Sequence, residues 1–231
     1  FKISASDGFD NEDLIDRLRM GKQIRSAKFS LNDYHFETPG TDLMAATDTT
    51  QELGTGDREQ YDYPGGYRVR KDGDNRVKIR MEEEESQIAL LSGSGECRPF
   101  CTGYRFKLTR ATQEEWNDKE YLLTGITHVL DQTQTYFSGT APGEKQIYRN
   151  DFDCISYDIP YRPVRKTPKP FVRGVQTAVV VGPSGEEIHT DKYGRVKVQF
   201  HWDREGQMDE NSSCWLRVIQ SMAGNAWGAM C

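Results

Sequence analysis

The alternation of apolar and polar residues predicts a chain built mainly from β-strands. Residues 103–109 and 120–130 alternate with a period of two, which is typical of strands that bury one face. Residues 27–36 give a further strand signal, and Thr38-Pro39-Gly40 follows it as a turn. Residues 41–60 contain few large apolar side chains and many Thr, Asp and Gly residues. We expect that stretch to be a loop or an ordered excursion.

Two segments have the spacing of helices instead. Residues 11–20 place Leu14, Ile15 and Leu18 on one helical face, after acidic residues that suit a helix start. Residues 76–91 place four apolar side chains close to one stripe, namely Val77, Met81, Ile88 and Leu91. The acidic run Glu82–Glu85 falls inside this second helix. Because neighbours on a helix point about 100° apart, these carboxylates cannot converge on one ligand, and we expect a solvated face.

Residues 161–174 are predicted to form an extended linker. Prolines at 160, 163, 168 and 170 remove backbone donors and favour a semi-rigid extended chain. The region is also basic, with nine Lys or Arg residues against four acidic ones between 161 and 204. It lacks the interleaved aromatic residues of a single-strand nucleic-acid binder. We expect it to lie across an acidic surface of its own assembly.

Residues 175–231 read as an all-β region. Residues 178–181 are an apolar run that predicts a strand buried on both faces, and residues 195–202 alternate cleanly. Residues 214–220 predict a fourth strand that is apolar on both faces. Short strands at this spacing fit a small barrel such as the five-stranded OB-fold, whose fifth strand is not visible. A small barrel has only one inside, so part of the last strand should meet another surface. The candidate trimer or barrel contacts are Trp215, Leu216, Val218 and Ile219.

Composition and charge narrow the possible functions. The 231 residues are 35% apolar and 29% charged, with a net charge of −6, which disfavours a general affinity for nucleic acid or anionic lipid. No apolar run reaches the roughly 18–20 residues needed for a membrane span, and no export signal is visible. Five irregularly spaced cysteines do not suggest a disulfide framework. The chain reads as a fragment of a longer protein that is made in the cytoplasm.

No catalytic or metal-binding pattern stands out. The chain has no GxSxG, HExxH or phosphate-binding GxxxxGK motif. His128 reads as an ordinary strand residue, and the pair Cys97 and Cys101 lacks a second pair of ligands. His189 and His201 lie on separate strands whose relative facing is unknown. We expect no catalytic residues, no metal and no cofactor, so a binding or structural role is favoured over an enzyme.

Longer stretches of sequence carry a specific resemblance. The segments RPVRKTPKP, GVQTAVVVGPSGEEIHTDKYGRVKVQFHWDREG, SSCWLRV and AGNAWGAM cover roughly 70 residues almost without interruption. They closely resemble the VgrG family, the spike proteins of type VI secretion systems. Upstream, NDYHFETP, YDYPGGY, CRPFCTGYRFKL, YLLTGITH and YRNDFDCI resemble the hub region of the family in the expected order.

The resemblance implies a mainly β protein with minor α content. Residues 1–160 would be the C-terminal portion of a phage-tail-hub-like β-barrel domain, 161–174 the linker, and 175–231 a truncated OB-fold collar. It also implies a homotrimer that sits on a hexameric Hcp-like tube, with a PAAR-like tip protein and effectors attached to the full-length protein. Such a spike caps the tube, helps to puncture target membranes, delivers effectors and is secreted by the apparatus without a stable membrane anchor.

Three other functions remain open at this point. The chain could belong to the hub and spike of a contractile phage-like tail. It could be part of a murein-cleaving enzyme whose catalytic domain lies outside this segment, because phage spikes can carry such a domain. An OB-fold could also bind oligonucleotides or sugars.

Overall fold

The computed structural model describes residues 2–3, 14–52, 57–131, 147–186, 188–219, 222–223 and 227–228. The chain forms two compact units, Phe1–Lys166 and Thr167–Cys231, which are called unit 1 and unit 2 below. The fold is mainly β, as the sequence predicts, and the described residues contain one α-helix where the sequence predicts two. No helix in those ranges combines the length and the apolar composition that crossing a bilayer requires.

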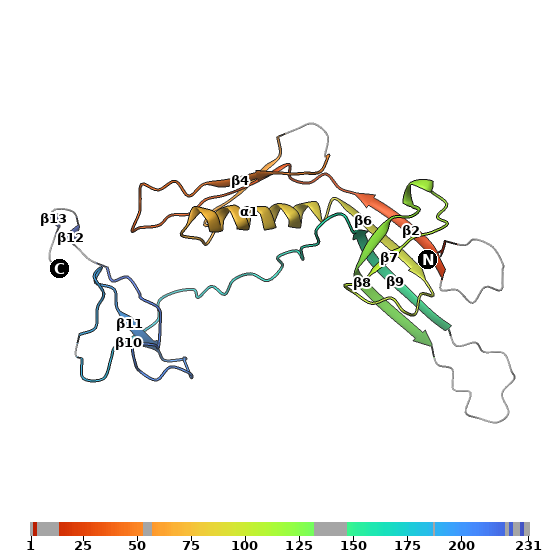
Figure 1. Cartoon of the computed structure of the whole chain (residues 1–231). Coiled ribbons are helices and arrows are strands. Elements are labelled where there is room, and N and C mark those ends of the chain that lie inside the picture. The colour runs from red at the N-terminus through yellow and green to blue at the C-terminus, as the bar shows by residue number, and fades with distance from the viewer. Residues whose placement is uncertain are drawn as a thin grey trace, which may run out of the picture. The chain divides into compact units, whose positions relative to one another are not determined.

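Unit 1 is built around a curled six-stranded sheet (Figure 1). Its strands, in spatial order, are β1 (Lys2–Ile3), β2 (Leu14–Lys22), β6 (Ala89–Gly95), β9 (Ile147–Ser156), β8 (Glu120–Asp131) and β7 (Arg105–Lys107). Neighbours pair antiparallel except for β1 and β2. A short 3-10 turn, η1 (Glu114–Trp116), lies between β7 and β8 in the chain. The strands predicted around 103–109 and 120–130 are confirmed.

One face of this sheet packs on an aromatic core. Phe100 lies 4.9 Å from Phe106 and 5.0 Å from Phe152, measured between ring centroids, and the second contact is edge-to-face. The other fully buried members of the cluster are Ile15, Leu91, Cys97, Leu108, Tyr121, Leu123 and Cys154. Tyr104, which the alternation assigned to the buried face, is 68% exposed because β7 begins one residue later.

The helix predicted at residues 11–20 is wrong for residues 14–20, which belong to strand β2. A β-bulge explains the misleading pattern. The register with β6 shifts between Ile15 and Arg17, so one extra residue separates Ile15 from the residues that follow. Ile15, Leu18 and Met20 then pack against the same core although they are three and two residues apart. The three-residue step from Ile15 to Leu18 is also the step between neighbours on one helical face.

A second part of unit 1 combines a three-stranded sheet with the helix. Its strands are β4 (Ala45–Asp48), β3 (Lys28–Leu31) and β5 (Glu59–Asp62), in that spatial order. Strand β3 pairs antiparallel with β4 and parallel with β5. The strand predicted within residues 27–36 is therefore confirmed. Residues 41–60, expected to be a loop or an ordered excursion, contain β4 and the start of β5, so they are not a simple loop.

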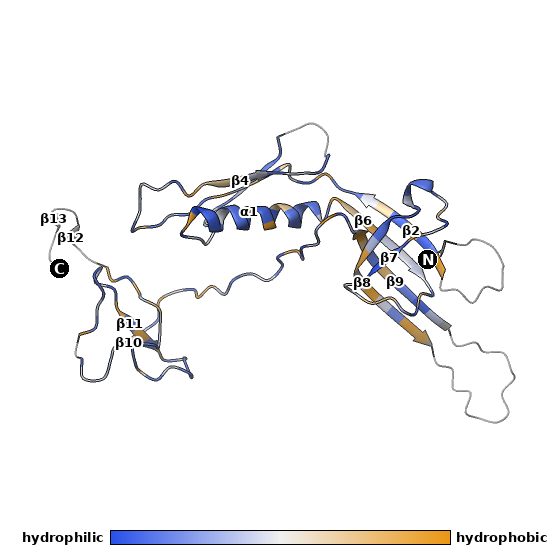
Figure 2. Cartoon of the chain, in the orientation of Figure 1, coloured by the Kyte–Doolittle hydropathy of each residue, from blue (hydrophilic) through white to orange (hydrophobic). Residues whose placement is uncertain are grey.

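Helix α1 (Arg70–Glu85) begins earlier and ends earlier than the pattern over 76–91 predicts. It is mostly hydrophilic along its length (Figure 2). Its large apolar residues are Val77, Ile79 and Met81. Val77 and Met81, one turn apart, pack on Phe29 and its neighbours in the three-stranded sheet, whereas Ile79 is 46% exposed. The helix also packs closely on Tyr67, since a Cβ on Gly73 would lie 2.6 Å from that ring. After Ser86 the chain turns into β6, so residues 89–91 are strand.

The described residues of unit 2 form only short strands. Strand β10 (Ala178–Val181) pairs antiparallel with β11 (Lys197–Phe200), and β12 (Met222–Ala223) pairs antiparallel with β13 (Trp227–Gly228). Val180 is 63% exposed, so the expectation that residues 178–181 are buried on both faces is wrong. The predicted strand at 214–220 is represented by one isolated bridge, Val196 to Leu216, among its described residues 214–219.

Candidate assembly surfaces

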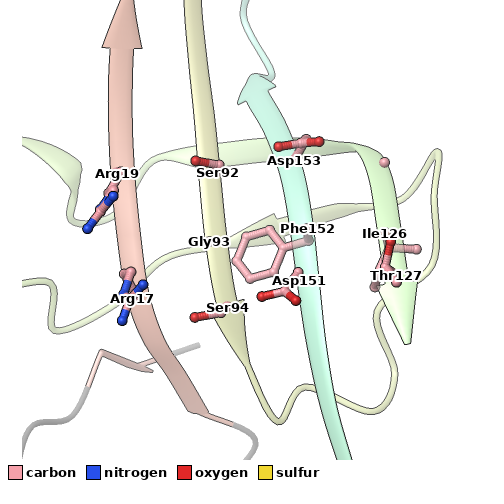
Figure 3. Close-up of a pocket in the computed structure, with 11 residues that line it drawn as sticks. Arg17, Arg19, Ser92, Gly93, Ser94, Ile126, Thr127, Asp151, Phe152 and Asp153 are labelled. Carbon is pink, nitrogen blue, oxygen red and sulfur yellow. The ribbon is translucent and has the colours of Figure 1, made fainter. Parts of the chain in front are cut away.

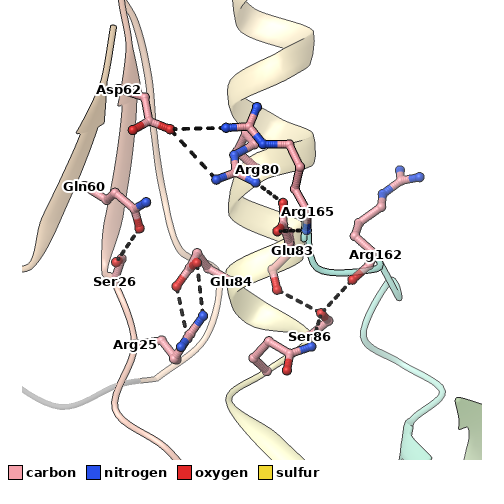
Figure 4. A network of polar contacts seen from close by, with 11 residues as sticks. Arg25, Ser26, Gln60, Asp62, Arg80, Glu83, Glu84, Ser86, Arg162 and Arg165 are labelled. Carbon is pink, nitrogen blue, oxygen red and sulfur yellow. Dashed lines mark hydrogen bonds and ion pairs between the residues drawn. The ribbon is translucent and has the colours of Figure 1, made fainter. Parts of the chain in front are cut away.

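The acidic run Glu82–Glu85, here called the acidic turn, makes polar contacts with several parts of unit 1, and Figure 4 shows Glu83 and Glu84 with their neighbours. Glu83, Glu84 and Glu85 are only 8%, 9% and 4% exposed, so the expected solvated face is wrong. The four carboxylates do point in different directions, as helix geometry requires. Together they reach three different segments of the chain, and the turn therefore works as a junction.

Two of these carboxylates hold segments next to the three-stranded sheet. Glu84 makes a two-point contact with Arg25, with Nη2 and Nε each 3.1 Å from a carboxylate oxygen. Oxygen Oε1 of Glu85 accepts hydrogen bonds from the hydroxyls of Thr49 and Thr50 at 2.8 and 2.9 Å, and from the amide of Thr50 at 2.6 Å. Bonds to an ionised acceptor are stronger than neutral ones, so both contacts hold α1 firmly beside β3 and β4.

The other two carboxylates bind the beginning of the predicted linker. Arg162 Nε lies 2.7 Å from Glu82 Oε2, and the amide of Arg165 donates to Glu83 Oε1 at 2.8 Å. The hydroxyl of Ser86 donates to the carbonyl of Arg162 at 3.2 Å. We call these five residues the linker clasp. At this end, the basic segment lies across an acidic surface of its own chain.

A further carboxylate, from strand β5, also contacts the linker segment. Asp62, at the end of β5, lies between the guanidinium groups of Arg80 and Arg165, at 3.9 and 4.0 Å. Arg80 also pairs with Glu83, and its guanidinium lies 5.0 Å from the centre of the Phe29 ring. The clasp is thus connected directly to the core beneath α1.

The cysteines and histidines show no arrangement for catalysis or metal binding in the described ranges. Cys97 and Cys154 are buried, whereas Cys101 is exposed. Burial, with the nearby Asp153 charge, raises the pKa of the Cys154 thiol to about 12. His128 lies at the surface with Nδ1 2.7 Å from the Tyr148 hydroxyl. Within the part of the chain that the structure describes, no three His, Cys, Asp or Glu residues are grouped to hold a metal.

The four residues proposed as trimer or barrel contacts lie along one short segment of unit 2. Trp215 is half-buried: its ring centroid lies 5.0 Å from that of His189, and Lys197 Nζ lies 5.0 Å from the ring centre. Leu216 forms the bridge to Val196. Val218 is 47% exposed and Ile219 is 100% exposed in the single chain. The segment thus has one side against its own unit and an apolar end open to solvent.

The chain is a member of the phage tail baseplate hub class of proteins. The sequence profile of the family described as "Phage tail baseplate hub (GPD)" matches residues 3–134, which is more than half of the chain. The chain therefore belongs to this family. The matched range contains β2 to β8 and the acidic turn, so the family assignment rests on unit 1.

Curated relatives narrow the class to homologues of type VI secretion spike proteins. The chain is 42% identical over 91% of its length to the "Type VI secretion system spike protein VgrG1b" of Pseudomonas aeruginosa, and 42% identical over 91% to VgrG1c of the same organism. With VgrG1a the identity is 40% over 92% of the chain. The resemblance to the VgrG family is therefore confirmed. The chain spans only 28%, 29% and 32% of the length of these three relatives.

Two solved tail proteins give low-scoring structural matches to the chain. They include the 43 kDa tail protein of prophage MuSo2 from Shewanella oneidensis, which is 12% identical, with a TM-score of 0.45 over 69% of this chain and 46% of that one. A tail protein from Neisseria meningitidis MC58 gives the same identity and TM-score over 68% and 43%. Likenesses of this size add nothing to the family assignment.

Proposed function

We propose that the protein containing this chain is a structural hub and spike component of a type VI secretion system. In this role it caps the tube, helps to puncture target membranes and delivers effectors. The observation that supports the proposal most strongly is the 42% identity to secretion spike proteins across 91% of the chain. The match to the baseplate hub family supports the same role for unit 1.

The proposal divides the chain by task. Residues 1–160 act as the C-terminal portion of the hub, 161–174 as the linker, and 175–231 as part of an OB-fold collar. The linker clasp supports this division, because it holds the first linker residues, Arg162 to Arg165, against the hub helix. The antiparallel ribbon of β10 and β11, with the bridge from Val196 to Leu216, supports a small antiparallel barrel.

The functional unit of this proposal is a homotrimer with contacts in the collar. Trp215 and Leu216 anchor the segment 214–219 within its own unit. Val218 and Ile219 then present apolar area that a single chain leaves in water. Burying such area favours association, and threefold symmetry allows two similar hub barrels in each chain to face a hexameric Hcp-like tube.

The remaining parts of the proposal follow from the same role. The full-length protein carries a PAAR-like tip and effectors, is made in the cytoplasm and leaves the cell through the apparatus. This chain contributes assembly contacts rather than catalysis, nucleic-acid binding or membrane anchoring. A hub and spike of a contractile phage-like tail is the second candidate, favoured by the description of the matching family as a tail baseplate hub. A murein-cleaving domain outside this segment remains compatible with either role.

The test uses the full-length protein in a strain that lacks it. We expect the wild-type protein to restore release of the tube protein and to be trimeric by light scattering. Ile219→Asp places a charge on the fully exposed end of the collar segment and should reduce both. Val175→Asp is the matched control, since Val175 is equally exposed, at 102%, but lies outside 214–220. A stable monomer that restores release fully would refute the trimer, and no restoration by the wild-type protein would refute the secretion role.

A further inference from the structure

The face of the large sheet opposite the aromatic core carries aligned polar side chains (Figure 3). Residues paired in register on neighbouring strands place their side chains on the same face. Two such rows cross β2, β6 and β9, and together they form what we call the polar groove: Arg17–Ser94–Asp151 and Arg19–Ser92–Asp153. A cavity of about 260 Å³ lies on these rows.

The groove has two charged walls and a low floor. Arg17 and Arg19 form the wall on β2, and the carboxylates of β9 form the opposite wall. The strand between them contributes only serine side chains on this face. Adjacent strands lie about 4.8 Å apart, so the two walls stand about 10 Å from each other. This is the spacing of the strand backbones, so a helix, about 10–12 Å across with its side chains, would lie above β6 with one wall on each side.

The polar groups of the groove are largely unsatisfied by the chain itself. Among the described residues, Arg17, Arg19 and Asp153 take part in no ion pair, while Asp151 reaches only Arg149, at 4.0 Å. Among the same residues, no ion pair joins the two walls. Ser94 is 4% exposed, and its hydroxyl has no hydrogen-bond partner in the same ranges. A buried hydroxyl without a partner is destabilising, so this face is suited to receive polar groups from elsewhere.

We propose that the polar groove docks a helical segment of another protein that carries acidic side chains along one side and basic side chains along the other. The acidic side of such a helix would contact the arginine wall, and its basic side would contact the aspartate wall. Charge complementarity selects this occupant, because a segment of uniform charge would be repelled by one of the two walls. The low serine floor leaves room for the helix backbone between them.

The test measures binding of a fluorescent alanine-based helical peptide to the 231-residue chain by anisotropy at low salt. The peptide has glutamates along one side and lysines along the opposite side, and about 18 residues let it form a helix in water. A peptide of the same composition with scrambled charges is its control. We expect the ordered peptide to bind more tightly, and reversal of one wall, by Arg17→Glu with Arg19→Glu, to weaken binding about tenfold.

Restoration by a second reversal separates recognition from a merely structural effect. Adding Asp151→Lys and Asp153→Lys inverts the groove, which should bind the same peptide with its direction reversed. Arg68→Glu with Lys71→Glu makes the same charge change on exposed positions away from the groove and should have no effect. If the reversed walls prevent folding, Arg17→Gln with Arg19→Gln should still weaken binding.

Three results would overturn the proposal. These are equal binding of the ordered and scrambled peptides, unchanged binding after reversal of one wall, and loss of binding without restoration in the inverted groove. Self-association that follows the same reversal and restoration would replace the proposed occupant by a second copy of the chain. All of these results are independent of tube-protein release, so the proposed secretion role stands or falls separately.

Discussion

The linker clasp makes a prediction about a single amide proton. The amide of Arg165 donates to the carboxylate of Glu83, which is 8% exposed. A hydrogen bond to a charged, largely buried acceptor contributes about 1.5–3 kcal/mol. Glu83→Ala removes the acceptor and should speed hydrogen exchange of the Arg165 amide by about 10–100-fold, since each 1.4 kcal/mol is a factor of ten. Glu83→Gln keeps a neutral acceptor, so about half of the free energy of this hydrogen bond should remain. The exchange rate of the Arg165 amide should then increase about tenfold or less.

The assay is native-state hydrogen exchange followed by NMR, with trypsin cleavage after Arg165 and Lys166 as a second readout. Released linker residues should be cut faster in the same order of variants. Glu120→Ala is the matched control, because Glu120 pairs with Arg105 at 3.1 Å in the same unit but away from the clasp. It should leave the Arg165 amide unchanged.

Amides in the core of β9 distinguish local release from general destabilisation. If Glu83→Ala frees only the linker, exchange at Phe152 and Cys154 should stay at the wild-type rate. The reasoning would be refuted if the Arg165 amide exchanged at the wild-type rate in Glu83→Ala. It would also be refuted if the Arg165 amide and the β9 core amides sped up equally.

Three further predictions test other parts of the chain. Gly93→Ala should lower the free energy of unfolding in urea by about 1–3 kcal/mol, because its Cβ would lie 2.4 Å from Phe152 Cζ; an unchanged midpoint would contradict the packing. Ellman's reagent should label the exposed Cys101 in the native protein but not Cys154, whose pKa is raised by burial to about 12; equal labelling rates would contradict the burial. Burial opposes ionisation of Asp191. Hydrogen bonds from the side chain and backbone of Arg195 and from the backbone of Tyr193 outweigh burial and hold the pKa of Asp191 below the usual 3.8. The turn from Asp191 to Arg195 should therefore be stable above pH 3.8 and lose order as the pH falls through the lowered pKa. An NMR titration should show this loss of order, and Asp191→Asn should abolish the pH dependence.

Much of the strand content could be predicted from the chain, and the reason is local. In the strands near 103–109 and 120–130 each residue faces either the core or solvent in turn, and that alternation is written in the order of the residues. The class and family could also be predicted, because long stretches of the chain resemble one family closely. These features need no knowledge of which distant segments meet.

Errors arose where a distant partner decides the local structure. The three-residue step from Ile15 to Leu18 fits one face of a helix and also one face of a bulged strand, and only pairing with β6 selects the strand. Pairing with β3 likewise turns the polar residues 45–48 into a strand. Ala89 to Leu91 leave the expected helix for the same reason, since β6 pairs on both sides.

The linker clasp and the polar groove show what the order of residues determines and what it does not. The sequence by itself determined that Glu82–Glu85 point in different directions and that the segment after Pro160 is extended and basic, because helix geometry and proline are local constraints. Only the tertiary structure decided that these carboxylates are buried and that two of them hold Arg162 and Arg165, about 80 residues away in the chain. The polar groove has the same origin, since its walls come from strands that are separated by more than 130 residues and aligned only by the register of the sheet.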